Sequence, residues 1–216
     1  KYTLKAPPFL GVYADGNRER MPYEADAYIQ QMGHYSVDRE YAIGKYTINF
    51  LINQASWPTE WQMHTIMMAW QDYMYTGDAG LLAARYDDLR TKTLIDLTEK
   101  NGLISTRTGL LTQELADKLC YPGELIKFRG IVDWPQGKES KGAGKYSYSM
   151  GILPTGETDG YEFTTYNTVV NAFHYHSLKL MENIAYVLGK KDDKAFFSKQ
   201  AAEHKKAFIE AFYVPE

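Results

Sequence analysis

The sequence predicts an all-α fold made of helical hairpins, and two observations support this prediction. Apolar residues recur at helical spacing through most of the chain. Three times, an apolar stretch of this kind ends at a glycine, and an acidic residue within five positions opens the next helix. Connections this short place successive helices antiparallel, as in an α-solenoid, a helix bundle or an arc of an α/α toroid.

The first hairpin is expected after an extended lead-in over residues 1–12. Residues 25–32 predict a helix that ends at Gly33, the usual residue for a left-handed helix cap. Asp38 is expected to cap a second helix. Gly44 lies inside that second helix at a cost of roughly 1 kcal/mol relative to alanine. The apolar face of the second helix is formed by Tyr41, Ile48, Leu51 and Ile52.

Two further hairpins follow the same pattern. Residues 61–75 predict a helix that ends at Gly77, and Asp78 opens another helix that continues to residue 100. Residues 165–188 predict a long helix that ends at Gly189. The last helix begins near Asp192 and continues to residue 212.

Residues 101–159 interrupt the helical pattern with a segment rich in glycine and tyrosine. Within it, residues 112–120 predict a short helix and residues 125–132 predict a strand. Nearly sixty irregular residues between helical hairpins are typical of a segment that lines a site. The alternative is a disordered insertion, which the many aromatic residues disfavour.

Composition excludes several classes of function. The net charge of −3 argues against nucleic acid or an anionic membrane as the partner. No apolar run reaches the roughly 18 residues of a membrane-spanning helix. The lone Cys120 excludes an internal disulfide framework, and His174 and His176 fall on different faces of a helix, so neither a metal site nor a cofactor is expected. The 14% of aromatic residues suits a sugar ligand or, more simply, a large core.

The densest polar cluster lies in residues 15–26, with four carboxylates and two arginines in twelve positions. Glycoside hydrolysis needs paired carboxylates, one protonated as general acid and one ionised. The alternative is a capping loop, in which Glu24 and Asp26 favour a helix N-terminus. Other carboxylates flanked by aromatic residues in loops are candidate sugar-binding groups: Trp57, Glu60 and Trp61; Asp133 and Trp134; and Glu162.

The order of residues in the first loop resembles the opening signature of the catalytic domain of bacterial α-L-rhamnosidases. The matching residues are Asp15 to Arg20, followed by Tyr23 and Asp26. Residues 70–78, 171–173 and 185–212 resemble helices of the same family. The resemblance implies an (α/α)6 barrel, of which residues 13–216 would form a part, because three hairpins are about half of six.

The resemblance also implies roles for individual residues. Glu19 would be the general acid, and Asp15, Arg18 and Asp26 would bind sugar hydroxyls. Tyr23 stands where the family usually has tryptophan, and this difference allows for another sugar. The family inverts configuration with a second glutamate as base, which is expected after the region that this chain covers, in the rest of the barrel or in further domains. A periplasmic or secreted location follows only from the habits of the family.

The leading hypothesis is an inverting glycoside hydrolase that removes terminal α-L-rhamnosyl or similar deoxysugar residues from glycans or glycosides. A second hypothesis is another carbohydrate-active enzyme of the toroid class, either a hydrolase of different specificity or a polysaccharide lyase. A third is a non-catalytic helical-repeat module that binds a glycan or a protein.

Overall fold

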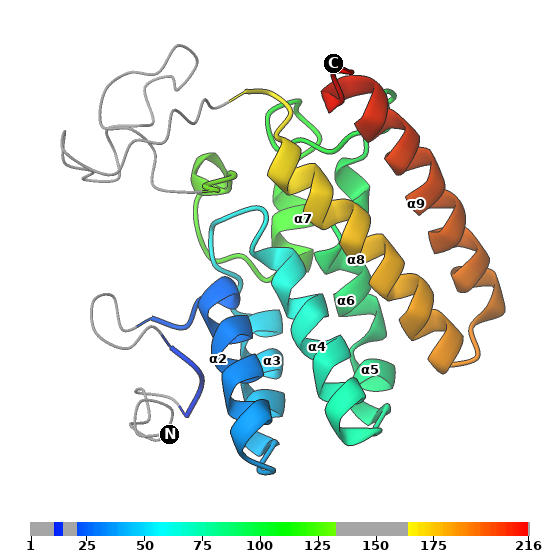
Figure 1. Cartoon of the computed structure of the whole chain (residues 1–216). Coiled ribbons are helices and arrows are strands. Elements are labelled where there is room, and N and C mark those ends of the chain that lie inside the picture. The colour runs from blue at the N-terminus through cyan, green and yellow to red at the C-terminus, as the bar shows by residue number, and fades with distance from the viewer. Residues whose placement is uncertain (1–10, 15–20, 133–163, 216) are drawn as a thin grey trace.

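A computed structural model describes residues 11–14, 21–132 and 164–215 of the chain, and this part is mainly helical. The residues that the model describes contain no strand. The helices, labelled as in Figure 1, are α2 (Glu24–Val37), α3 (Ala42–Asn53), α4 (Gln62–Thr76), α5 (Gly80–Ala84), α6 (Tyr86–Lys92), α7 (Gln113–Lys118), α8 (Thr168–Val187) and α9 (Lys191–Phe212). Two short 3-10 helices, η1 (Ile95–Leu97) and η2 (Leu125–Lys127), lie in the connecting segments.

The helices form two layers. Helix α4 lies between α2 and α8 and contacts both of them. Helices α3, α5 and α6 pack against α4 from the other layer, and α9 forms a long antiparallel hairpin with α8 (Figure 1). The three helices α2, α4 and α8 run in the same direction, so their N-termini meet at one end of the molecule (Figure 1). This hairpin architecture confirms the all-α fold class that the sequence predicts.

The apolar stripes of the helices meet in two clusters. The larger cluster lies between the two layers and includes Ile48, Leu51, Ile66, Met181 and Phe197. The smaller cluster joins the start of α4 to the segment between α6 and α8, and includes Met63, Leu97, Ile104, Leu119 and Phe128. Burying a side chain of this size contributes about 1.5–3 kcal/mol. The described part of the irregular segment therefore has a core of its own.

Two of the predicted glycine caps are confirmed, and the third is wrong. Gly77 and Gly189 have φ values of 69° and 71°, in the left-handed region that glycine adopts without strain. Helix α2 instead continues through Gly33 to Val37. The extra turn buries His34 and Tyr35 against neighbouring helices, and this packing outweighs the low helix propensity of Gly33.

Asp38 does not cap α3, contrary to the expectation. Its carboxylate accepts the N–H groups of Arg39 and Glu40 within the connection, and α3 begins only at Ala42. The N–H of Ala42 is instead bound by the carboxylate of Glu40 at 2.7 Å. A polar connection of several residues offers more than one side chain for this purpose, so the sequence pattern alone does not choose between them.

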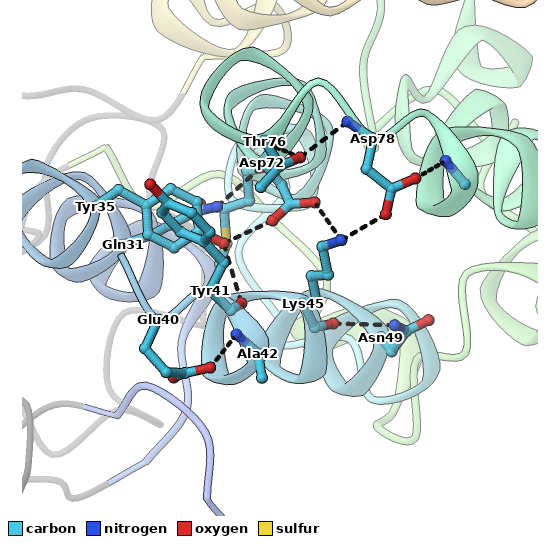
Figure 2. Close-up of polar contacts among 12 residues, drawn as sticks. Gln31, Tyr35, Glu40, Tyr41, Ala42, Lys45, Asn49, Asp72, Thr76 and Asp78 are labelled. Atoms are coloured by element: carbon cyan, nitrogen blue, oxygen red, sulfur yellow. Dashed lines mark hydrogen bonds and ion pairs between the residues drawn. The ribbon is translucent and has the colours of Figure 1, made fainter. Parts of the chain in front are cut away.

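A network of polar groups joins the C-terminal ends of α2 and α4 to the start of α3 (Figure 2). The hydroxyl of Tyr35 donates to the buried carboxylate of Asp72 at 2.7 Å. Lys45 lies 3.9 Å from Asp72 and 2.8 Å from Asp78. A Cβ on Gly44 would lie 2.1 Å from the hydroxyl oxygen of Tyr35. The glycine in α3 is therefore required by the close approach of Tyr35.

The single helix expected over residues 81–100 is broken into α5, α6 and η1. Leu94 adopts a left-handed φ of 61° and turns the chain so that Leu94 and Leu97 enter the smaller apolar cluster. Burial of these two side chains explains why the helix stops before them. The leucines of residues 81–100 recur at helical spacing, so the sequence pattern does not indicate that the helix is interrupted.

The strand expected over residues 125–132 is also wrong. The chain forms η2 and then an extended stretch, in which Arg129 makes an isolated bridge to Pro58. A strand needs a neighbouring strand for its backbone groups, and the described part of the chain offers only this short contact. The short helix expected over residues 112–120 is confirmed as α7, with Thr112 accepting the N–H of Leu115 as its cap.

In the described ranges, no helix combines the length and the apolar character needed to cross a membrane.

Candidate active site

The N-terminal ends of α2, α4 and α8 bring several connecting segments together at one end of the molecule (Figure 1). Five of the site residues expected from sequence lie in the described part of the chain: Tyr23, Asp26, Trp57, Glu60 and Trp61. The others lie outside the described residues: Asp15, Arg18, Glu19, Asp133, Trp134 and Glu162.

Three aromatic side chains form a half-buried cluster at this end. The ring centroids of Tyr23 and Trp61 are 5.3 Å apart, and those of Trp57 and Trp61 are 6.4 Å apart. Tyr23 directly precedes α2, and Trp61 directly precedes α4, so the parallel packing of these helices brings the two rings together. The guanidinium carbon of Arg129 lies 6.0 Å from the ring centroid of Trp57. Exposed ring faces of this kind suit the apolar face of a sugar. Here Tyr23, Trp57 and Trp61 are called the aromatic cluster.

Glu60 lies behind the aromatic cluster, with only 2% of its surface exposed. One carboxylate oxygen accepts the N–H of Ile131 at 3.0 Å and the N–H of Val132 at 2.6 Å. Burial raises the pKa of Glu60, while the amides of Val132 and Ile131 act in the opposite direction because they favour the ionised form. The geometry is that of a carboxylate that fixes the 129–132 segment against the start of α4.

A second buried carboxylate, Glu24, begins α2 and is completely shielded from solvent. It accepts the N–H of Ser56 at 3.0 Å and also the hydroxyl of Ser56. Lys92 is equally buried, and its ammonium donates to Gln62 and to the carbonyl oxygen of Leu119, each at 3.0 Å. Gln62 lies between the two charges, because its amide nitrogen is 3.5 Å from Glu24. In the sequence, Glu24 is one of the four carboxylates of residues 15–26, and the alternative expected for it was a helix-terminus residue.

The two buried charges stabilise each other at a distance. Burial raises the pKa of Glu24, and the charge of Lys92 opposes that effect. Burial lowers the pKa of Lys92 to about 8, against the opposing charge of Glu24. This pair anchors the start of α2, immediately after Tyr23, to α6 and to the start of α4. The burial of Lys92 could not be predicted from the sequence pattern, because a lysine on a surface helix is ordinarily solvated.

Asp26 occupies the first turn of α2 and is half-buried. A carboxylate at this position is favoured by the helix dipole, whatever its further role. It follows Tyr23 by three positions, at the helix end where the aromatic cluster lies.

His64, one turn beyond Trp61 on α4, lies between side chains of α2 and α8. Its ring centroid is 5.9 Å from that of Tyr28 and 4.7 Å from that of Phe173. The Nδ1 atom lies 3.2 Å from the carbonyl oxygen of Glu60, which can only accept, so Nδ1 carries the proton. Burial lowers the pKa of His64 to about 4, so the ring is neutral at pH 7. No group of three metal-binding side chains occurs in the described part of the chain.

The arrangement offers stacking surfaces and buried carboxylates at one end of parallel helices, which is what a carbohydrate site requires. Comparison with curated proteins and with solved structures finds no match. Over residues 1–216 the sequence matches the model of the bacterial α-L-rhamnosidase six-hairpin glycosidase domain. The helical hairpins agree with that description, and the family is one of glycosidases that act on carbohydrate. The chain therefore belongs to the six-hairpin glycosidase domain family of bacterial α-L-rhamnosidases.

Proposed function

We propose that this glycosidase removes terminal α-L-rhamnosyl residues, or those of a similar deoxysugar, with inversion of configuration. The observation that carries the proposal is the aromatic cluster at the shared N-terminal end of the parallel helices, where Asp26 lies in the first turn of α2. The methyl group of a 6-deoxysugar adds apolar surface that stacks well on such rings. In sequence, Glu19 precedes Tyr23 of the aromatic cluster by four positions, a separation of at most about 14 Å along the chain.

The proposed roles are those that the family resemblance implies, together with the carboxylates and aromatic residues of the loops. Glu19 protonates the glycosidic oxygen as the sugar leaves, and a carboxylic acid with a raised pKa performs this step. Asp15, Arg18 and Asp26 hold sugar hydroxyls. The aromatic cluster of Tyr23, Trp57 and Trp61 supports the sugar ring, with Asp133, Trp134 and Glu162 as further sugar-binding residues.

An inverting reaction also needs a carboxylate that activates water, about 6.5–9.5 Å from the acid. We do not assign this role to Glu60, because its oxygens already accept two backbone amides. Within the proposal Glu60 contributes to sugar binding indirectly, by holding the loop that carries Arg129 against Trp57.

The decisive experiment varies the leaving group. For Glu19→Gln, hydrolysis of aryl α-L-rhamnosides should slow by at least about 10²-fold, and the loss should grow as the leaving phenol becomes less acidic. An acidic phenol such as p-nitrophenol needs little protonation, whereas an alkyl glycoside needs it fully. The matched control, Glu114→Gln, alters an exposed residue on α7 that is paired with Lys118, and it should leave the rates unchanged.

Three results would contradict the proposal. Equal losses for all leaving groups would exclude Glu19 as the acid. Proton NMR of the first product formed tests the stereochemistry, because inversion of an α-rhamnoside releases the β anomer first. Initial release of the α anomer would exclude the inverting reaction. Sugar binding without any turnover would favour a non-catalytic glycan-binding module.

A further inference from the structure

His64 keeps some contact with solvent at a place where the start of α4 is otherwise buried. It is 9% exposed, whereas every other residue of 62–66 is completely buried. Its ring lies between Tyr28 of α2 and Phe173 of α8, with centroids 5.9 Å and 4.7 Å away, and both of these residues are half-buried. The exposed part of His64 therefore opens between the rings of the two helices that flank α4 (Figure 1).

The two ring nitrogens of His64 have different surroundings. Nδ1 lies 3.2 Å from the carbonyl oxygen of Glu60 and carries the proton, because a carbonyl oxygen can only accept. Nε2, at the tip of the ring, makes no hydrogen bond with any residue that the structure describes, and it is not shielded from solvent. Burial, and to a smaller extent the charge of His176, lower the pKa of His64 to about 4. At pH 7 the ring is neutral, and Nε2 presents a lone pair that can only accept.

His64 lies one turn further along α4 than the aromatic cluster. Trp61 and His64 are three positions apart, so they are neighbours on the helix surface, separated by about 4.5 Å along its axis. The N–H of His64 donates to the carbonyl oxygen of Trp61 at 3.0 Å, which fixes the backbone between them. A sugar that stacks on Trp61 would therefore bring its hydroxyl groups to the level of the His64 ring.

Packing alone does not account for a histidine at this position. Phenylalanine would fill the space between Tyr28 and Phe173 without adding a polar atom that needs a partner. His204 provides a contrast, because its Nδ1 and Nε2 atoms lie 2.8 Å and 2.9 Å from the carbonyl oxygens of Gly102 and Asn171. Both nitrogens of His204 serve the fold, whereas Nε2 of His64 is open to a ligand.

We propose that Nε2 of His64 accepts a hydrogen bond from one hydroxyl group of the sugar that stacks on the aromatic cluster, and that His64 thereby selects sugars that carry this hydroxyl. The inference rests on the proposed function for the place where the sugar binds. A hydroxyl can donate to a neutral imidazole nitrogen, so the contact needs no change of protonation near pH 7. An analogue that lacks the hydroxyl leaves Nε2 without a donor, and sites built to bind a hydroxyl discriminate against such analogues.

Substrates that lack single hydroxyl groups test this contact. The parent enzyme and His64→Phe are compared on p-nitrophenyl α-L-rhamnoside and on its 2-, 3- and 4-deoxy analogues. For one analogue, the loss of kcat/KM relative to the rhamnoside should be at least about ten-fold larger in the parent than in the variant. The intrinsic reactivity of each analogue cancels, because the same substrate is compared in both proteins. Equal losses in both proteins for all three analogues would overturn the proposal.

Two further variants separate the contact from packing. His64→Gln offers an amide oxygen as an acceptor, and it should recover part of the discrimination that His64→Phe loses. The matched control is His34→Phe, because His34 is also 9% exposed but lies in the last turn of α2, where Nδ1 is 2.5 Å from the hydroxyl of Tyr13. The control should discriminate among the analogues as the parent does. The same loss of discrimination in the control would contradict a specific contact of His64.

Long-range proton–nitrogen NMR of the full chain observes the two nitrogens of His64 directly. At pH 7, Nδ1 should be protonated, and Nε2 should give the signal of an unprotonated nitrogen. That signal should shift when L-rhamnose is added, because a hydrogen bond to Nε2 changes its electronic surroundings. A proton on Nε2 at pH 7 would overturn the proposal, since such a nitrogen donates instead of accepting.

The outcomes separate this inference from the proposed function. Rhamnoside hydrolysis in which one hydroxyl is coupled to His64 supports both. Rhamnoside hydrolysis without such coupling overturns the role of His64 and leaves the proposed function standing. If no rhamnoside is hydrolysed, the proposed function fails. In that case a shift of Nε2 with L-rhamnose still supports the contact, and no shift overturns it as well.

Discussion

The carboxylate of Glu60 accepts the backbone N–H of Val132 at 2.6 Å, across 72 positions of the sequence. The same oxygen accepts the N–H of Ile131, and Val132 has a left-handed φ of 58°. A residue other than glycine adopts this conformation at a cost, which the hydrogen bonds to a buried carboxylate offset. Glu60 therefore holds the backbone of residues 131 and 132 against the start of α4.

Removing the Glu60 acceptor should destabilise the protein. Glu60→Ala leaves two buried amides without a partner, and the free energy of unfolding should fall by about 2–3 kcal/mol. Glu60→Gln keeps an amide oxygen in the same place and should cost less than about 1 kcal/mol. Denaturation in urea measures both variants. Equal losses for alanine and glutamine would mean that the acceptor is unimportant.

The buried charges of Glu24 and Lys92 should be strongly coupled. Lys92→Met removes the donor to Gln62 and Leu119 and leaves Glu24 without a compensating charge, so stability should fall by about 3 kcal/mol. Adding Glu24→Gln should restore part of this loss. A double-mutant cycle measured by urea denaturation gives the coupling energy. Strictly additive effects of the two substitutions would contradict the charge coupling.

Two glycines in neighbouring helices should respond oppositely to alanine. A methyl group at Gly44 would overlap the hydroxyl of Tyr35, so Gly44→Ala should lower stability by about 1–3 kcal/mol. Gly33 is helical and has nothing within 4 Å of a Cβ, so Gly33→Ala should raise stability by about 0.5–1 kcal/mol. Thermal unfolding of the two variants tests the pair. Stabilisation by both substitutions would show that Tyr35 moves aside freely.

Acid should destabilise the fold through its buried histidines. Burial, and then the charge of His204, lower the pKa of His174 to about 3. Below pH 6.5 the unfolded chain binds a proton that folded His174 does not, so stability falls as the pH falls, by up to about 1.4 kcal/mol per pH unit. His174→Asn keeps a donor for the carbonyl oxygen of Thr93, the partner of Nδ1, but does not titrate.

The comparison is made between pH 6.5 and 5, above the range of most carboxylates. As the pH falls, the unfolding free energy of the variant should decrease less steeply than that of the parent protein. The two slopes should differ by the uptake of about one proton on unfolding. Urea denaturation at several pH values in this window gives both slopes. Identical slopes would show that His174 is protonated in the folded protein.

The aromatic cluster should affect binding more than chemistry. Trp61→Ala removes the ring that contacts both Tyr23 and Trp57, and KM for an aryl rhamnoside should rise about ten-fold. Trp70→Ala is the control, since Trp70 lies on the same helix and packs on Tyr73 instead. Steady-state kinetics compares the two variants. An equal rise in KM for both would point to a general effect of losing tryptophan from α4.

Local sequence rules predicted the helices well where a single interaction decides the outcome. Gly77 and Gly189 end their helices because only glycine adopts the required φ without strain, and this is visible in sequence. Gly33 looks the same in sequence but lies inside α2, because the burial of Tyr35 two residues later outweighs its propensity. Leu94 breaks a helix for a similar reason, through burial that no local pattern records.

The site shows the same limit. The aromatic neighbours of Glu60 were visible in sequence, and the structure brings Tyr23, Trp57 and Trp61 together. What sequence could not provide was the direction of the Glu60 side chain, which turns into the protein to bind Ile131 and Val132. Lys92 and Arg129 were also missed, because isolated basic residues carry no spacing signal.

The hydrogen bonds of Glu60 have a consequence for redesign of the enzyme. The segments around residues 57–61 and 129–132 are far apart in the chain, but they share one carboxylate, and Arg129 is bonded through its backbone to both Trp57 and Thr59. Exchanging either segment alone for that of a relative would leave the other without its support. Loop grafts that aim at a new sugar specificity should therefore transfer both segments together, as one inherited unit.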